Sequence, residues 1–135
     1  MEYFRRKYVC KNQIKKGVAG IRHALDYLRK DYSIALMIDQ RVSEGENVPF
    51  FGKGALTTTL PAQLAIKFKC EIIPIYISRT ENDNFKIEIY DPLKINMNDN
   101  SDRNKLQITE TLNKILESMI LKNPGQWIWT HNRWK

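Results

Sequence analysis

The sequence has few of the side chains from which metal sites and nucleophilic catalysts are built. Its 135 residues include two cysteines and two histidines. Cys10 and Cys70 are far apart and belong to no CxxC or Cys/His cluster, so nothing supports a zinc site or a disulfide framework. Neither histidine stands in an HExxH motif or near a Gly-x-Ser-x-Gly turn. We therefore predict no metal, no cofactor and a reducing, cytosol-facing compartment.

Long hydrophobic runs are also absent. No run approaches the roughly 18 to 20 apolar residues that a helix needs to span a bilayer. The basic beginning, MEYFRRKYVCKNQIKK, is not followed by the apolar stretch of a signal peptide. We predict a chain that neither crosses a membrane nor carries an export signal, although it can lie on a membrane surface.

Basic residues outnumber acidic ones, 22 to 15, which gives a formal charge of +7. Such a chain attracts anionic partners: the phosphates of a nucleic acid, an anionic membrane face or an acidic protein. Charge alone does not choose among these three. The hydrophobic content of 42% indicates a folded chain, and the length fits one domain.

The apolar pattern predicts an α/β fold, a mixed sheet with a β-hairpin and flanking helices. The continuous run Ser33–Ile38 is typical of a strand covered on both faces in a parallel sheet. Residues 71–78 and 85–90 predict the hairpin, with Pro74 making its first strand irregular. We predict helices over residues 17–29, 60–69 and 103–122, the last capped from the polar loop 96–102.

Asp39, Gln40 and Arg41 directly follow the apolar run 33–38. In open α/β sheets, ligands bind at the carboxyl ends of strands. A carboxylate there can bind a hydroxyl, and an arginine can pair with phosphate through two hydrogen bonds. The alternative is a strand end that is merely solvated by charged residues, and position alone does not decide between them.

The segment from Asn47 to Ala65, NVPFFGKGALTTTLPAQLA, is the second candidate site. Phe50 and Phe51 are too apolar for an ordinary surface loop, so they either fold back as a lid or touch lipid. Gly52, with Gly54, lets the backbone approach a ligand, and a helix start attracts anions. Thr57, Thr58 and Thr59 precede that helix, and N-capping by Thr59 together with turn geometry is the structural alternative that the residues alone favour.

Two further patterns have mainly structural explanations. Gly17 and Gly20 form a G-x-x-G of the kind with which a KH module clamps RNA, which keeps open a small basic RNA-binding module, yet they more simply open a helix. His23 lies off the apolar stripe of that helix and is predicted at its surface. In the terminal WIWTHNRWK, Trp127, Trp129, His131 and Arg133 share one face if the segment is extended, and we favour a packed core position for at least one tryptophan.

Taken in order, IALMIDQ, VPFFGKGALTTTLPAQLA, EIIPIYISR and PGQWIWTHNRWK resemble the lauroyl/myristoyl acyltransferase family of lipid A biosynthesis, from about Ile14 to Lys135. The resemblance implies transfer of a fatty acyl chain from acyl carrier protein to an anionic glycolipid acceptor, a lipid A precursor, at the cytoplasmic face of the bacterial inner membrane. It also implies that Asp39, Gln40 and Arg41 belong to the acceptor pocket. The phenylalanines would then face lipid or acyl chain, with the helix start near polar headgroup atoms. No nucleic acid partner is expected.

The sequence departs from the family pattern at the catalytic motif, H-x-x-x-x-(D/E), in which the histidine is the general base. His23 is followed five positions later by Leu28, and His131 is too near the end to complete the motif. We therefore expect no catalytic residue among residues 1–135, which would form the C-terminal portion of a single acyltransferase domain. The chain would then be a truncated gene product, an artificial fragment, or one piece of a split enzyme whose partner is a separate N-terminal half that carries the motif. A lipid-binding remnant without activity is a further alternative.

Overall fold

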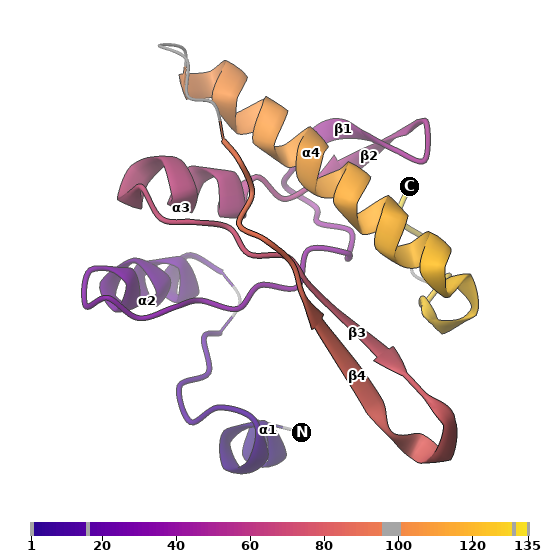
Figure 1. Ribbon diagram of the computed structural model, residues 1–135. Helices are drawn as coiled ribbons and strands as arrows, with labels where there is room; N and C mark the ends of the chain where they lie inside the picture. The colour runs from indigo at the N-terminus through magenta and orange to yellow at the C-terminus, as the bar shows by residue number, and fades with distance from the viewer. Residues whose placement is uncertain (1, 16, 96–100, 131, 135) are drawn as a thin grey trace. The chain divides into compact units, whose positions relative to one another are not determined.

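The computed structural model describes residues 2–15, 17–95, 101–130 and 132–134 (Figure 1). It divides the chain into two compact units, Met1–Leu36 and Met37–Lys135, and each is described by itself.

The first unit contains two helices, α1 (Glu2–Tyr8) and α2 (Val18–Leu28). Gly17 precedes α2 with a φ of 94°, a backbone conformation that glycine adopts without strain. Gly20 lies inside the helix, where an added Cβ would come within 1.7 Å of the Lys15 carbonyl oxygen. Both glycines therefore serve the start of a helix, as predicted, and do not enclose an RNA-binding loop. His23 is exposed on α2, which confirms its predicted surface position.

The prediction of a buried parallel strand at Ser33–Ile38 is wrong. These residues form no strand, and Met37 is 80% exposed. Every strand in the described part of the chain pairs antiparallel within one of two two-stranded sheets. An apolar run becomes a strand only where a neighbour pairs with its backbone N–H and C=O groups, and this run has none there.

The second unit begins with the antiparallel pair β1 (Glu46–Phe50) and β2 (Lys53–Thr57), followed by α3 (Leu60–Phe68). A second antiparallel pair, β3 (Ile75–Arg79) and β4 (Phe85–Ile89), is joined by a 3-10 turn, Glu81–Asp83. The long helix α4 (Ser101–Lys122) and a second 3-10 turn, Pro124–Gln126, complete it. The predicted α/β class, the 85–90 hairpin and the helices at 60–69 and 103–122 are confirmed. The predicted cap in loop 96–102 falls largely outside the described residues.

Helix α4 organises the second unit because it packs against both β1 and α3 (Figure 1). Its C-terminal half contributes Ile120 to a cluster with Phe50 and Ala55, against which Phe51, Leu116, Trp127 and Trp134 pack. Its N-terminal half contributes Ile108 and Leu112 to a second cluster with Ala62 of α3. The predicted core position of one tryptophan is thus confirmed by Trp127, whereas Trp129 is 52% exposed.

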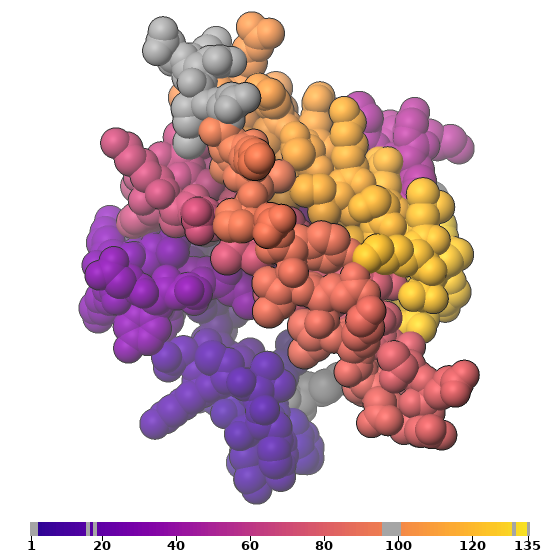
Figure 2. Space-filling view, in the orientation of Figure 1, coloured from indigo at the N-terminus to yellow at the C-terminus, as the bar shows by residue number. Residues whose placement is uncertain are grey.

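The β3–β4 hairpin turns its polar face toward the end of α4. Lys122 Nζ donates to Glu88 Oε2 at 2.6 Å, and Asn123 Nδ2 donates to the Tyr76 hydroxyl at 3.1 Å. Figure 2 shows the hairpin lying beside the C-terminal part of the chain. The opposite face is apolar and exposed, and it comprises Ile75, Ile77, Phe85, Ile87 and Ile89.

Candidate functional site

The β1–β2 hairpin is closed by a two-residue turn with unusual backbone geometry. Phe51 and Gly52 both have positive φ, 49° and 72°, as in a type I′ turn. Phenylalanine is disfavoured at such an angle, so neighbouring contacts must hold it there. The Phe51 N–H donates to Glu117 Oε1 of α4 at 2.7 Å, and the Phe51 ring meets the Phe50 ring edge-on at 4.9 Å. The two phenylalanines are thus anchored from α4.

Arg133 is the most completely buried charged side chain that the structure describes, with 0% of its surface exposed. Its Nη2 donates to Thr57 Oγ1 at 2.9 Å, and its Nη1 donates to the Leu56 carbonyl oxygen. The guanidinium also lies over the Phe50 ring, 5.2 Å from the centroid. The next residue, Trp134, donates from Nε1 to the Phe50 carbonyl oxygen at 2.9 Å. The end of the chain therefore fastens onto β1 and β2.

Thr57 is the polar centre of this attachment. Its hydroxyl accepts hydrogen bonds from Arg133 and, at 3.2 Å, from Asn113 Nδ2 of α4, and donates to the Ala55 carbonyl oxygen at 3.0 Å. Asn113 Nδ2 also donates to the Pro49 carbonyl oxygen at 2.9 Å. A buried hydroxyl with three partners satisfies its full hydrogen-bonding capacity. One threonine thus joins the hairpin, α4 and the terminal segment.

Asp39 lies close enough to Arg133 for its charge to act on the arginine. Burial lowers the pKa of Arg133, and the negative charge of Asp39 opposes that shift. Asp39 Oδ1 and Arg133 Nε are both buried and have no hydrogen-bond partner among the described residues. One oxygen of the Asp39 carboxylate is therefore buried without a hydrogen bond from any described residue.

Thr58 and Thr59 lie at the start of α3. Thr59 occupies the predicted N-cap position, but its hydroxyl makes no capping bond and instead accepts from Gln63 Nε2 at 2.8 Å. Thr58 Oγ1 accepts the Leu60 N–H at 3.3 Å. The threonine run is thus largely engaged in local structure.

The structure brings together only part of the predicted site. Asp39, Phe50 and Thr57 gather around Arg133, whereas Gln40 and Arg41 are exposed and extend the group toward solvent. The expectation that both phenylalanines face lipid or acyl chain is wrong for Phe50, which is 0% exposed because it fills the core between α4 and the terminal segment. Phe51 is partly buried and Gly52 exposed. A substrate-binding role for the other predicted residues stays a prediction.

Sequence reasoning missed Arg133 and Asn113 as members of this group. The sequence pattern predicts that Arg133 shares one extended face with Trp127, Trp129 and His131, but residues 128–130 form no strand and His131 lies outside the described residues. The available indication for Asn113 was its place on the buried side of α4, between Leu112 and Leu116. An amide at such a position must have hydrogen-bond partners.

Other features of the described residues add little to the site. A hollow of about 30 Å³ between residues 93–95 and the first half of α4 has room for about one water, and none of the predicted site residues lines it. No group of three or more His, Cys, Asp or Glu side chains among the described residues is arranged to hold a metal ion. None of the described helices combines the length and apolarity needed to cross a bilayer.

A comparison with models of known protein families gives a match for this chain. The family model described as bacterial lipid A biosynthesis acyltransferase matches residues 5–135. No curated protein matches the chain. The match spans nearly the whole sequence, including Asp39, the β1–β2 hairpin and the terminal arginine. The chain therefore belongs to the bacterial lipid A biosynthesis acyltransferase family.

Proposed function

We propose that the chain takes part in moving a fatty acyl chain from acyl carrier protein to a hydroxyl of a lipid A precursor, at the cytoplasmic face of the inner membrane. The observation that carries this proposal is the family match over residues 5–135. The charge of +7 supports it, because the donor protein is acidic and the acceptor carries phosphates.

In this proposal, the acceptor binds beside Asp39, a half-buried residue at the edge of the buried group around Arg133. The carboxylate of Asp39 accepts a hydrogen bond from a sugar hydroxyl. Arg41 is exposed two residues further on and suits a phosphate, because a guanidinium and a phosphate form two parallel hydrogen bonds. Arg133 places a buried positive charge near the Asp39 carboxylate.

The chain supplies binding groups but no general base for the acceptor hydroxyl. Neither of its histidines begins an H-x-x-x-x-(D/E) motif. A positioned general base contributes typically 10²- to 10⁴-fold to a rate. We therefore propose that residues 1–135 do not transfer acyl groups by themselves and that a polypeptide carrying the motif completes the site.

Binding of the acceptor tests the proposal without requiring turnover. The ligand is a bisphosphorylated lipid A precursor in detergent micelles, and its affinity is compared between the natural chain and Asp39→Asn and Arg41→Gln variants. A lost charge-assisted hydrogen bond is worth about 1.5 to 3 kcal/mol, so each variant should bind about tenfold or more weakly. Lys53→Gln is the matched control, because it removes an exposed cation from the tip of β2.

Two results would count against the acceptor site. In one, the natural chain binds the precursor no better than detergent carrying no phosphate. In the other, Lys53→Gln weakens binding as much as Arg41→Gln, which would mean that overall charge attracts the ligand without a defined site.

A further inference from the structure

The first helix of the chain carries a cluster of exposed aromatic rings. In α1, Tyr3, Phe4 and Tyr8 are 66%, 63% and 69% exposed. Phe4 stacks on Tyr8 with centroids 6.2 Å apart, and the edge of Tyr3 meets Phe4 at 5.6 Å. None of the three belongs to either hydrophobic cluster of the described residues. They form an apolar surface that the first unit itself leaves uncovered.

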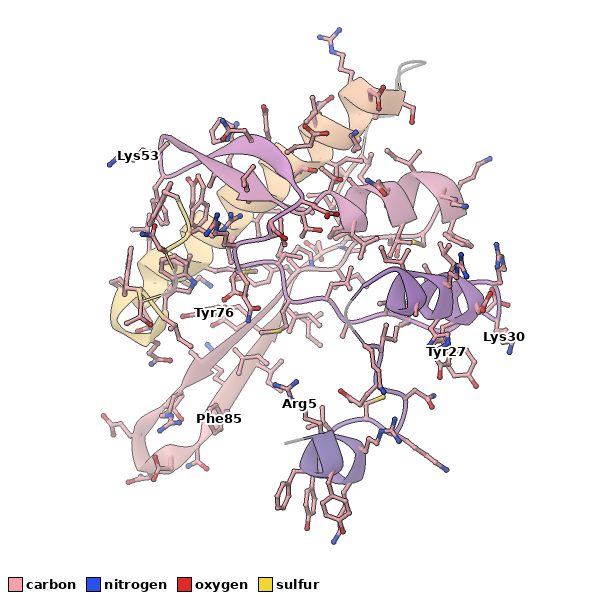
Figure 3. The ribbon with its side chains drawn as sticks, turned by 180° about the vertical axis from the view of Figure 1, so that it is seen from behind. Arg5, Tyr27, Lys30, Lys53, Tyr76 and Phe85 are labelled. Carbon is pink, nitrogen blue, oxygen red and sulfur yellow. The ribbon has the colours of Figure 1, made fainter. Side chains whose placement is uncertain are left out.

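Cations accompany these rings. Lys7 Nζ lies 5.9 Å from the centroid of Tyr3 and 5.1 Å from that of Tyr8. Successive residues of a helix are rotated by about 100° around its axis. Around α1, Lys7 therefore lies between Tyr3 and Phe4, and Arg5 lies next to Tyr8. Figure 3 shows the Arg5 side chain reaching away from the α1 backbone. The last turn of α1 contains three consecutive basic residues, Arg5, Arg6 and Lys7.

We propose that α1 binds the surface of a bilayer with anionic headgroups, with Tyr3, Phe4 and Tyr8 at the boundary of the acyl region and the cations at lipid phosphates. Rings with polar tips are enriched at this depth of a membrane, and basic residues beside an apolar face are typical of helices that lie in the interface. Charge complementarity selects an anionic surface. This inference takes one premise from the proposed function, namely that the chain works at a membrane.

An acidic protein is the main competing occupant, because the same cations would attract it. The rings favour the bilayer, since three exposed aromatic side chains gain most where apolar surface can be buried. Near an anionic bilayer, each basic residue contributes about fivefold to binding. Loss of two cations should therefore weaken vesicle binding about 25-fold, and loss of two rings should weaken it on neutral and anionic vesicles alike.

The experiment is co-sedimentation of the full chain with phosphatidylcholine vesicles, with and without phosphatidylglycerol. Phe4→Ala/Tyr8→Ala removes two rings, and Arg5→Gln/Lys7→Gln removes two cations. The matched controls are Tyr32→Ala/Phe85→Ala, two rings exposed elsewhere by 54% and 61%, and Lys53→Gln/Lys114→Gln, two exposed cations of the second unit. All eight side chains are exposed, and circular dichroism verifies that each variant keeps its helix content.

The proposal is supported if the natural chain sediments with phosphatidylglycerol vesicles and only the two α1 variants lose this binding. It is overturned if the natural chain does not bind, or if the controls lose as much as the α1 variants. It is overturned in favour of an acidic protein if the α1 variants bind vesicles normally but no longer bind purified acyl carrier protein. These measurements use neither the lipid A precursor nor acyl transfer, so their failure leaves the proposed function standing.

Discussion

Replacement of Thr57 by valine isolates the hydroxyl that joins β2, α4 and the end of the chain. Valine keeps the shape of threonine, and the site is 3% exposed, so little else changes. Arg133 Nη2 loses its acceptor, a charged hydrogen bond worth about 1.5 to 3 kcal/mol. Asn113 loses a longer bond of about 1 kcal/mol but keeps the Pro49 carbonyl oxygen. We therefore expect Thr57→Val to lower the free energy of unfolding by about 3 kcal/mol.

Urea denaturation followed by tryptophan fluorescence measures this loss, because Trp127 and Trp134 pack on the same cluster. Thr57→Ser is the control, since it keeps the hydroxyl and removes one methyl group, at about 1 kcal/mol. If the valine and serine variants are equally stable, the hydroxyl does not hold the terminal segment, and the description of Arg133 as its partner is wrong.

Three further predictions concern the packing and charges of the second unit. Phe50→Ala should cost about 3 to 5 kcal/mol, clearly more than Phe51→Ala, in the same urea assay, because Phe50 is fully buried; equal losses would contradict the core assignment. Lys122 and Lys86 lower the pKa of Glu88 from 4.5 to about 2, so its contribution to stability is present above pH 4.5 and lost as pH falls toward 2. The melting temperatures of the natural chain and Glu88→Gln should therefore converge over that range, and a constant difference would refute the ion pair. Ile87→Thr should change unfolding by no more than about 0.5 kcal/mol, because the side chain is 61% exposed; a larger loss would show that this face is covered.

The helices of the second unit could be predicted from the sequence because each is long enough for its apolar residues to recur with the helical period. Residues 101–122 place Ile108, Leu112 and Met119 on one buried stripe, and the predicted helix differs from α4 by two residues at its start. Pro61 and Thr59 likewise mark the start of α3. Local pattern determines such elements, because helical hydrogen bonds form within the segment itself.

The β1–β2 hairpin could not be read in this way. Its strands are five residues long, and Phe51-Gly52 is not the Asn-Gly or Asp-Gly pair that identifies a type I′ turn. The turn is held by Glu117, which is 66 residues away. The strand predicted at 33–38 failed for the related reason that a strand depends on a neighbour, which a single segment does not reveal.

The sequence predicts some residues of the candidate site, but it does not predict how the fold brings them together. Position and composition identify Asp39 and Thr57 as candidates. Arg133 connects them in the structure, and it lies 76 residues after Thr57 in the sequence. A basic residue near a chain end is ordinarily solvated. Its burial follows from the hydrogen bonds that the hairpin offers, and these exist only once the hairpin has formed.

The most direct measurement for the central claim is acyl transfer by the purified chain, with acyl-loaded carrier protein as donor and a lipid A precursor as acceptor. We predict that residues 1–135 give no product above the protein-free blank. We expect turnover once a polypeptide carrying the H-x-x-x-x-(D/E) motif is added. Clear turnover by the chain alone would contradict this prediction.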